Sequence, residues 1–152
     1  MHEATKDVEV KGARYQIGRL TARDGSWILL QLTPKISKAM QQVREDEPDT
    51  FALAFISSVI EEIAQTDEDT FRRIQEHALT VCRRYEKDNV PMPVFLAGRG
   101  FAIKELEYDL VAVMALTCHA LIFNLAPFFT EGGFQQMLSG LSPASNPAPS
   151  PN

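Results

Sequence analysis

The sequence is poor in cysteine, in basic charge and in signals for export. Two cysteines among 152 residues, Cys82 and Cys118, are too few for a disulfide framework and fit free thiols. Fifteen basic residues against 20 acidic ones give a net charge of -5, which disfavours a nucleic-acid binder, because such a protein needs a clustered basic face. The chain begins without a basic segment followed by an apolar run, so we expect no secretory signal and a cytosolic protein.

Motifs for catalysis and metal binding are missing as well. Neither cysteine belongs to a CxxC pair, and the adjacent Cys118 and His119 project about 100° apart on a helix, so they cannot chelate one ion together. His77 and Cys82 miss a shared helical face. Gly98-Arg-Gly100 lacks the surroundings of a phosphate loop and is interpreted as a turn. We expect no catalytic residue, metal or cofactor, and an enzyme that uses Cys118 or His119 is the disfavoured alternative.

Charge is nearly absent from the C-terminal third of the chain. Beyond Asp109 the only charged side chain is Glu131. A helix built from the apolar stretch Leu110–Ala126 is expected to be buried on nearly every side. A membrane span is disfavoured, because it needs about 20 apolar residues and this stretch is shorter and contains His119 and Asn124. Since a small bundle rarely encloses a helix completely, we expect part of its surface to meet another copy or a partner.

The N-terminal region predicts a hairpin followed by a helix. Apolar and polar residues alternate over residues 6–19, with a turn at Lys11-Gly12, which is typical of a β-hairpin. Thr21 and Asp24 then form a helix-capping signature. Pro34 lies inside the helical pattern that follows, so the helix either kinks there or ends and gives way to a second helix.

Three further helices are expected. A charged loop at Arg44–Asp49 precedes the first of them, and the next is capped at Thr66–Asp69 and continues past Tyr85 to Lys87. The last runs from about Lys104 to Asn124 and ends before Pro127. A loop with a short strand at Val94–Leu96 connects the last two. The inward face of the first of these helices is expected to carry Leu53, Ile56, Ile60 and Ile63, with Phe55 and Val59 beside them. The second is expected to bury Phe71, Ile74 and Ala78, and the last Leu106, Leu110 and Val113.

The arginines of the third helix allow two interpretations. A solvated face is the ordinary one. The alternative is a basic ridge for an acidic partner, formed by Arg72, Arg73, Arg83 and Arg84.

Two segments follow the last helix. In the first of them, Phe134, Met137, Leu138 and Leu141 recur at the spacing of one helical face. This segment either docks in a groove of a partner or folds back over the core. Ser142–Asn152 is rich in proline and serine and cannot bury enough apolar surface to fold, so we expect a disordered tail. The residues that we expect to bind a partner are Phe128, Phe129, Phe134, Met137, Leu138 and Leu141.

These patterns together predict a mainly α protein, with a small helical bundle, an N-terminal β-hairpin and a disordered Pro/Ser-rich C-terminal tail. Residues 1–141 form one domain and residues 142–152 the tail. Neither nucleic acid nor a membrane is expected as a partner. The residues alone therefore indicate a soluble interaction protein.

The run from Gly12 to Ile36 resembles the opening of the tail assembly chaperones of long-tailed bacteriophages. An Asn-Leu-x-x-Phe-Phe stretch of those proteins is also similar to the one from Asn124 to Phe129, and the likeness covers residues 6–138. The matching residues of the opening are Gly12, Tyr15, Ile17, Gly18, Leu20 and Ala22.

The resemblance implies a non-catalytic chaperone that binds the tape measure protein, helps to recruit tail tube subunits and self-associates. It also implies action in the host cell cytoplasm and absence from the mature virion. We hypothesise that the uncharged C-terminal third carries partner binding, self-association or both, because apolar faces supply non-directional contact. The alternative is a generic homo-oligomeric helical adaptor without a phage role, which the neighbouring genes would distinguish.

Overall fold

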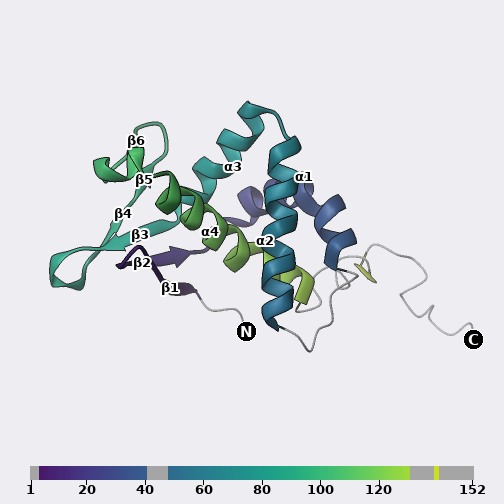
Figure 1. Cartoon of the computed structure of the whole chain (residues 1–152). Helices are drawn as coiled ribbons and strands as arrows, with labels where there is room; N and C mark the ends of the chain where they lie inside the picture. Colours follow the sequence, from purple (N-terminus) through teal and green to yellow (C-terminus); the bar gives the residue numbers. More distant parts are fainter. Residues whose placement is uncertain (1–3, 41–47, 131–138, 141–152) are drawn as a thin grey trace, which may run out of the picture.

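The computed structural model describes residues 4–40, 48–130 and 139–140, and there the chain combines helices with antiparallel sheets (Figure 1). The expectation of a mainly α bundle is wrong, because the N-terminal hairpin is half of a four-stranded sheet of order β1-β2-β3-β4. The strands are β1 Thr5–Val10, β2 Ala13–Gly18, β3 Cys82–Tyr85, β4 Pro91–Pro93, and the separate pair β5 Phe95–Leu96 and β6 Gly100–Phe101. The helices are α1 Ala22–Met40, α2 Pro48–Gln65, α3 Glu68–Thr80 and α4 Leu110–Thr130, with 3-10 turns η1 Lys87–Asn89 and η2 Lys104–Tyr108.

The predicted hairpin is confirmed. Val10 pairs with Ala13, so Lys11 and Gly12 form a two-residue turn, and their φ values of 52° and 81° fit the primed turns that match strand twist. Tyr15 and Ile17 of β2 are buried on the face of the sheet that meets the helices. A hairpin alone is marginal in water, and here β2 gains a further partner strand on its other edge.

That partner strand is β3, and it corrects the expected third helix. The helix α3 ends at Thr80 and not beyond Tyr85, because residues 82–84 pair with β2, with Ile17 opposite Cys82. Arg83 and Arg84 consequently lie on a strand, and the basic ridge on one helix does not form. The helix cap is also one residue later than expected, since the side chain of Asp67 accepts the Thr70 N–H at 3.0 Å.

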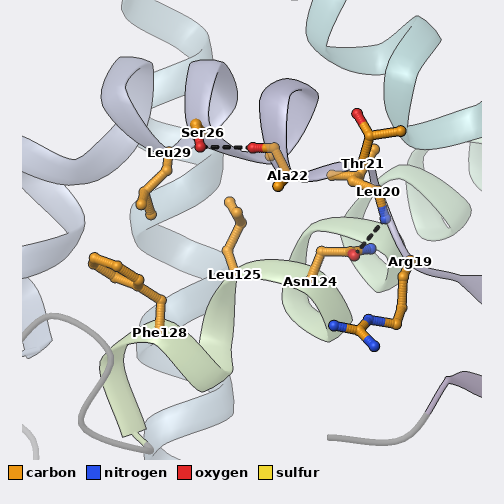
Figure 2. A pocket seen from close by; sticks show the side chains of 10 residues that line it. Arg19, Leu20, Thr21, Ala22, Ser26, Leu29, Asn124, Leu125 and Phe128 are labelled. Atoms are coloured by element: carbon orange, nitrogen blue, oxygen red, sulfur yellow. Dashed lines mark hydrogen bonds between the residues drawn. The ribbon is translucent and has the colours of Figure 1, made fainter. Parts of the chain in front are cut away.

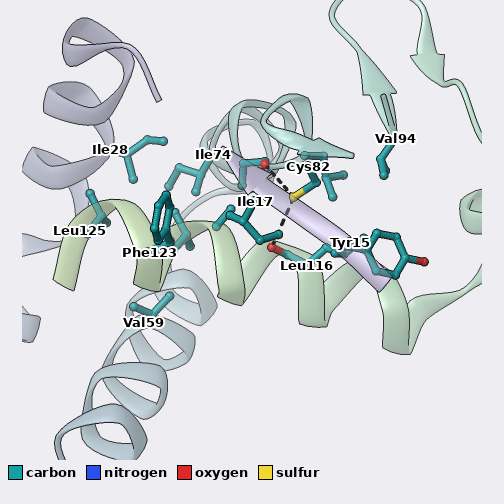
Figure 3. Packing of buried hydrophobic residues seen from close by; sticks show 14 of the residues in the cluster. Tyr15, Ile17, Ile28, Val59, Ile74, Cys82, Val94, Leu116, Phe123 and Leu125 are labelled. Carbon is teal, nitrogen blue, oxygen red and sulfur yellow. Dashed lines mark hydrogen bonds between the residues drawn. The ribbon is translucent and has the colours of Figure 1, made fainter. Parts of the chain in front are cut away.

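The helix α4 is the central element of the core. It contacts the other three helices and strands β1 and β2. By length and composition Leu110–Phe129 could cross a membrane, yet 44% of this apolar window is buried inside the protein. The close-up in Figure 3 shows Leu116, Phe123 and Leu125 meeting side chains from the sheet and from the other helices. The buried residues of α4 are Ala112, Leu116, Thr117, Ala120, Leu121, Phe123 and Leu125.

The ends of α4 differ from the prediction. The helix begins at Leu110 after the η2 turn, and it passes through Pro127 to Thr130 where an end near Asn124 was expected. Proline inside a helix costs about 3 kcal/mol because it has no N–H to donate. The helix continues because its last turn is anchored: the ring of Phe129 lies edge-on to Phe55 of α2, with centroids 6.1 Å apart.

Three predicted inward positions point outward instead. On α2, Phe55 and Val59 are buried, whereas Leu53 is 68% exposed and Ile60 is 47% exposed. Both sets have helical spacing, and periodicity alone cannot choose between them. Leu110 was expected inside and is 75% exposed, while Leu106 is buried as predicted.

The remaining expectations fall partly outside the described residues. The helix α1 continues past residue 34, so it is not divided into two helices. The expected loop at Arg44–Asp49 lies mostly in the undescribed residues 41–47, and its last two residues belong to α2. The short strand at Val94–Leu96 is confirmed in part as β5, and Gly98 adopts a positive φ of 77° in the turn that follows. The expected tail at 142–152 lies outside the described residues.

The half-buried His119 on α4 should make stability depend on pH. Burial, and to a smaller extent the nearby charge of Lys6, lowers its pKa below the ordinary 6.5. As pH falls through 6.5 the unfolded chain therefore binds a proton before the folded protein does, and stability is lost. We expect His119→Gln to flatten the decline of the unfolding free energy between about pH 7 and pH 5, measured by urea denaturation. An unchanged pH slope in this variant would contradict the assignment.

Candidate protein-binding site

The side chain of Asn124 joins α4 to the end of the hairpin. Its Nδ2 donates to the Gly18 carbonyl at 3.1 Å and to the Ala120 carbonyl at 2.9 Å. Its Oδ1 accepts the Leu20 N–H at 2.7 Å. Figure 2 shows this last contact at the junction that leads from β2 into α1. One amide thus fixes where the sheet ends and where α1 begins relative to the core helix.

Gly18 lets two backbone segments approach closely at the junction. The Gly18 N–H donates to the Val81 carbonyl at 2.7 Å, where the chain passes from α3 into β3. A Cβ at this position would lie 3.2 Å from that carbonyl oxygen, a tight contact that would push the two backbone segments apart by a few tenths of an ångström. Gly18, Leu20 and Asn124 all belong to the patterns that carry the family resemblance, and the structure brings them together.

A pocket of about 260 Å³ opens beside this junction, between the start of α1 and the end of α4. Leu29, Leu125 and Phe128 form an apolar side, and Arg19 and Asn124 lie on the polar side (Figure 2). We call it the α1–α4 pocket. Its full lining comprises Arg19, Leu20, Thr21, Ala22, Gly25, Ser26, Leu29, Asn124, Leu125 and Phe128.

The residues expected to bind a partner are only partly placed by the structure. Phe128 and Phe129 lie half-buried on the last turns of α4, with ring centroids 5.5 Å apart. Phe128 lines the α1–α4 pocket, whereas Phe129 packs against the core. Their assignment to partner binding stays a prediction. Phe134, Met137, Leu138 and Leu141 lie outside the described residues.

A second apolar surface lies at the opposite end of α4. Tyr108 is 88% exposed, Leu110 75% and Val111 63%, and we call these three residues the Tyr108–Val111 corner. Asp109 holds the corner in place, because its Oδ1 accepts the Ala112 N–H at 3.0 Å and its Oδ2 lies 3.0 Å from the Lys11 ammonium. The Ala112 N–H and then Lys11 lower the pKa of the Asp109 carboxyl.

The sequence indicated Phe128 as a partner-binding residue, but it did not place the α1–α4 pocket or the exposed Tyr108–Val111 corner. Asp109 three residues before Ala112 is a helix-cap signal that places the start of α4 at Leu110. That start would have indicated that Leu110 and Val111 lie in the exposed first turn. The α1–α4 pocket has no comparable signal, because its lining comes from segments that are distant in sequence.

Neither cysteine thiol is activated as a nucleophile. Burial raises the pKa of the Cys82 thiol to about 12, and it also raises the pKa of Cys118. The Cys82 Sγ donates to the Ala78 carbonyl at 3.3 Å, as a structural thiol does. Residues 4–40, 48–130 and 139–140 contain no group of three His, Cys, Asp or Glu side chains that could hold a metal ion. The arrangement is suited to contact with apolar protein surface.

Removal of the Asn124 amide should destabilise the fold. In Asn124→Ala the Leu20 N–H and the Gly18 carbonyl lose their partner, and an unsatisfied half-buried polar group costs about 1–3 kcal/mol. We expect the unfolding free energy to fall by that amount in urea denaturation monitored by circular dichroism. Arg23→Ala is a surface control, because Arg23 is exposed on α1 and alanine is favourable in a helix. Equal stability of Asn124→Ala and the wild type would show that the contact is dispensable.

Comparison with known protein families agrees with the resemblance that these sequence patterns indicate. A family model described as phage tail assembly chaperone protein, TAC, matches residues 11–137. No curated protein and no solved structure gives a significant match. The matched region includes the hairpin turn, the Asn124 junction, the α1–α4 pocket and the Tyr108–Val111 corner. Since the model covers most of the chain, this protein belongs to the phage tail assembly chaperone family.

Proposed function

We propose that the protein binds the tape measure protein through the Tyr108–Val111 corner and helps to recruit tail tube subunits. Its family gives it a role in phage tail assembly, with phage tail proteins as partners. The observation that carries the finer proposal is the exposure of Tyr108, Leu110 and Val111 together on a turn that Asp109 holds in place.

The physical case rests on what the partner needs. A tape measure protein exposes long apolar helices, and masking them requires apolar surface that a soluble protein can keep exposed. Each square ångström of apolar area removed from water contributes about 25 cal/mol. The corner offers an aromatic and two aliphatic side chains at little ordering cost, because Lys11 and the Ala112 N–H already fix the backbone beside them.

The site of action follows from this partner. Tail proteins are made and assembled in the host cell, so we place the chaperone in the host cytoplasm. We also propose that it leaves before the virion is complete, because a chaperone that masks the tape measure protein must give way to the tail tube.

Self-association is assigned to a different face. Leu53 and Ile60 lie two helical turns apart on the exposed side of α2, which is a spacing typical of helix pairing. We propose that this face meets a second copy. In size-exclusion chromatography with light scattering, Leu53→Asp combined with Ile60→Asp should lower the molar mass, and an unchanged mass would contradict the assignment.

Co-expression with the tape measure protein of the same phage tests the main proposal. We expect Leu110→Asp combined with Val111→Asp to reduce the co-purified tape measure protein about tenfold or more, since two buried apolar contacts are worth at least the 1.4 kcal/mol of a tenfold change. Leu30→Asp is the matched control, because Leu30 is 73% exposed on α1 and belongs neither to the corner nor to the α1–α4 pocket. Wild-type co-purification by the double variant would show that the corner is not the binding surface.

A further inference from the structure

The α1–α4 pocket contains a glycine that the backbone does not require. Gly25 lies inside α1, where its N–H donates to the Thr21 carbonyl at 2.8 Å, so its conformation is open to any residue. A Cβ there would meet its nearest neighbour, the Leu20 Cβ, at 3.9 Å, which is ordinary contact. Glycine inside a helix is less favourable than alanine. What the missing side chain does here is leave space in the pocket, whose lining includes this residue.

The polar groups of the pocket are occupied, with one exception. The Thr21 hydroxyl accepts the Asp24 N–H, and the Ser26 hydroxyl donates to the Ala22 carbonyl at 2.6 Å. Asn124 is held by the junction. Arg19 is exposed, and within the described residues its guanidinium has no acidic partner. It is therefore the group that remains for a ligand.

The size and charge of the pocket limit the kind of ligand that it can bind. A volume of about 260 Å³ is below the range of roughly 300–1,000 Å³ that small-molecule sites occupy, and it suits a single large side chain. Leu29, Leu125 and Phe128 make one side of it apolar. Arg19 is complementary to a carboxylate, whereas the chain as a whole carries a net charge of -5 and repels acidic segments elsewhere.

We propose that the α1–α4 pocket binds an amphipathic helix of the partner that carries an acidic residue one turn from a leucine or phenylalanine. The apolar side chain enters between Leu29 and Phe128, and the carboxylate pairs with Arg19. This inference rests on the proposed function, in which the partner is the tape measure protein. The Tyr108–Val111 corner then binds apolar surface in general, and the pocket selects the position along the partner helix at which the chaperone binds.

Co-expression of the full chain with the tape measure protein tests the pocket, with three variants. Gly25→Leu fills the space, and Arg19→Glu reverses the charge that meets the carboxylate. Arg23→Glu is the matched control, because Arg23 is an exposed arginine of α1 outside the pocket lining. Thermal melting followed by circular dichroism checks each fold, and Gly25→Ala, which removes a helix glycine, should melt at an equal or higher temperature.

We expect Gly25→Leu and Arg19→Glu to reduce co-purified tape measure protein tenfold or more, with Arg23→Glu at the wild-type level. If both pocket variants are folded and co-purify as the wild type does, the pocket assignment is overturned and the proposed function stands. If Arg23→Glu loses the partner as Arg19→Glu does, general charge rather than the pocket is responsible, and the assignment is again overturned. If the wild type itself captures no tape measure protein, the proposed function is wrong and the pocket assignment with it.

Discussion

The fold depends on one amide side chain that ties three parts of the chain together. Asn124 lies in the most apolar helix of the protein, where a polar group is costly unless it is hydrogen-bonded. Its bonds to Gly18 and Leu20 satisfy it and at the same time align the sheet, α1 and α4. The pocket beside it is lined by residues from the start of α1 and the end of α4, which meet at that junction. A structural constraint and a candidate binding surface therefore share one residue.

Local sequence signals were sufficient to predict an element where the pattern was compatible with only one structure. The hairpin followed from alternation and from a turn at Lys11-Gly12, and the start of α1 followed from Thr21, whose hydroxyl does accept the Asp24 N–H. Tertiary pairing decided the rest. Residues 82–84 continued a helical pattern, but they pair with the open edge of β2 as a strand. Pro127 indicated an end to α4, but packing of Phe129 on Phe55 carried the helix past it.

The candidate site was harder to predict because it consists of apolar side chains that are left outside the core. In α2 the pattern offered two apolar faces, and the choice of Phe55 over Leu53 for the interior was made by α4. The helix α4 was expected to be buried on nearly every side, with part of its surface left for a partner, and 44% of its apolar window is buried. Adhesive surface remains at its first turn, around Leu110, and beside Phe128 near its end. The family resemblance, by contrast, could be identified from sequence, because its residues maintain turns and junctions.

The helix α4 carries one candidate surface at each end, and between them it packs against the other helices and the sheet. Its 21 residues span about 30 Å at 1.5 Å per residue. Because the rod cannot bend without disrupting the core, the separation of the two surfaces is constant. A partner that contacts both surfaces binds more tightly than through either one only if its own two contact points lie at the same separation. The central helix would in that case act as a ruler, able to recognise the periodicity of an extended chain as well as its composition.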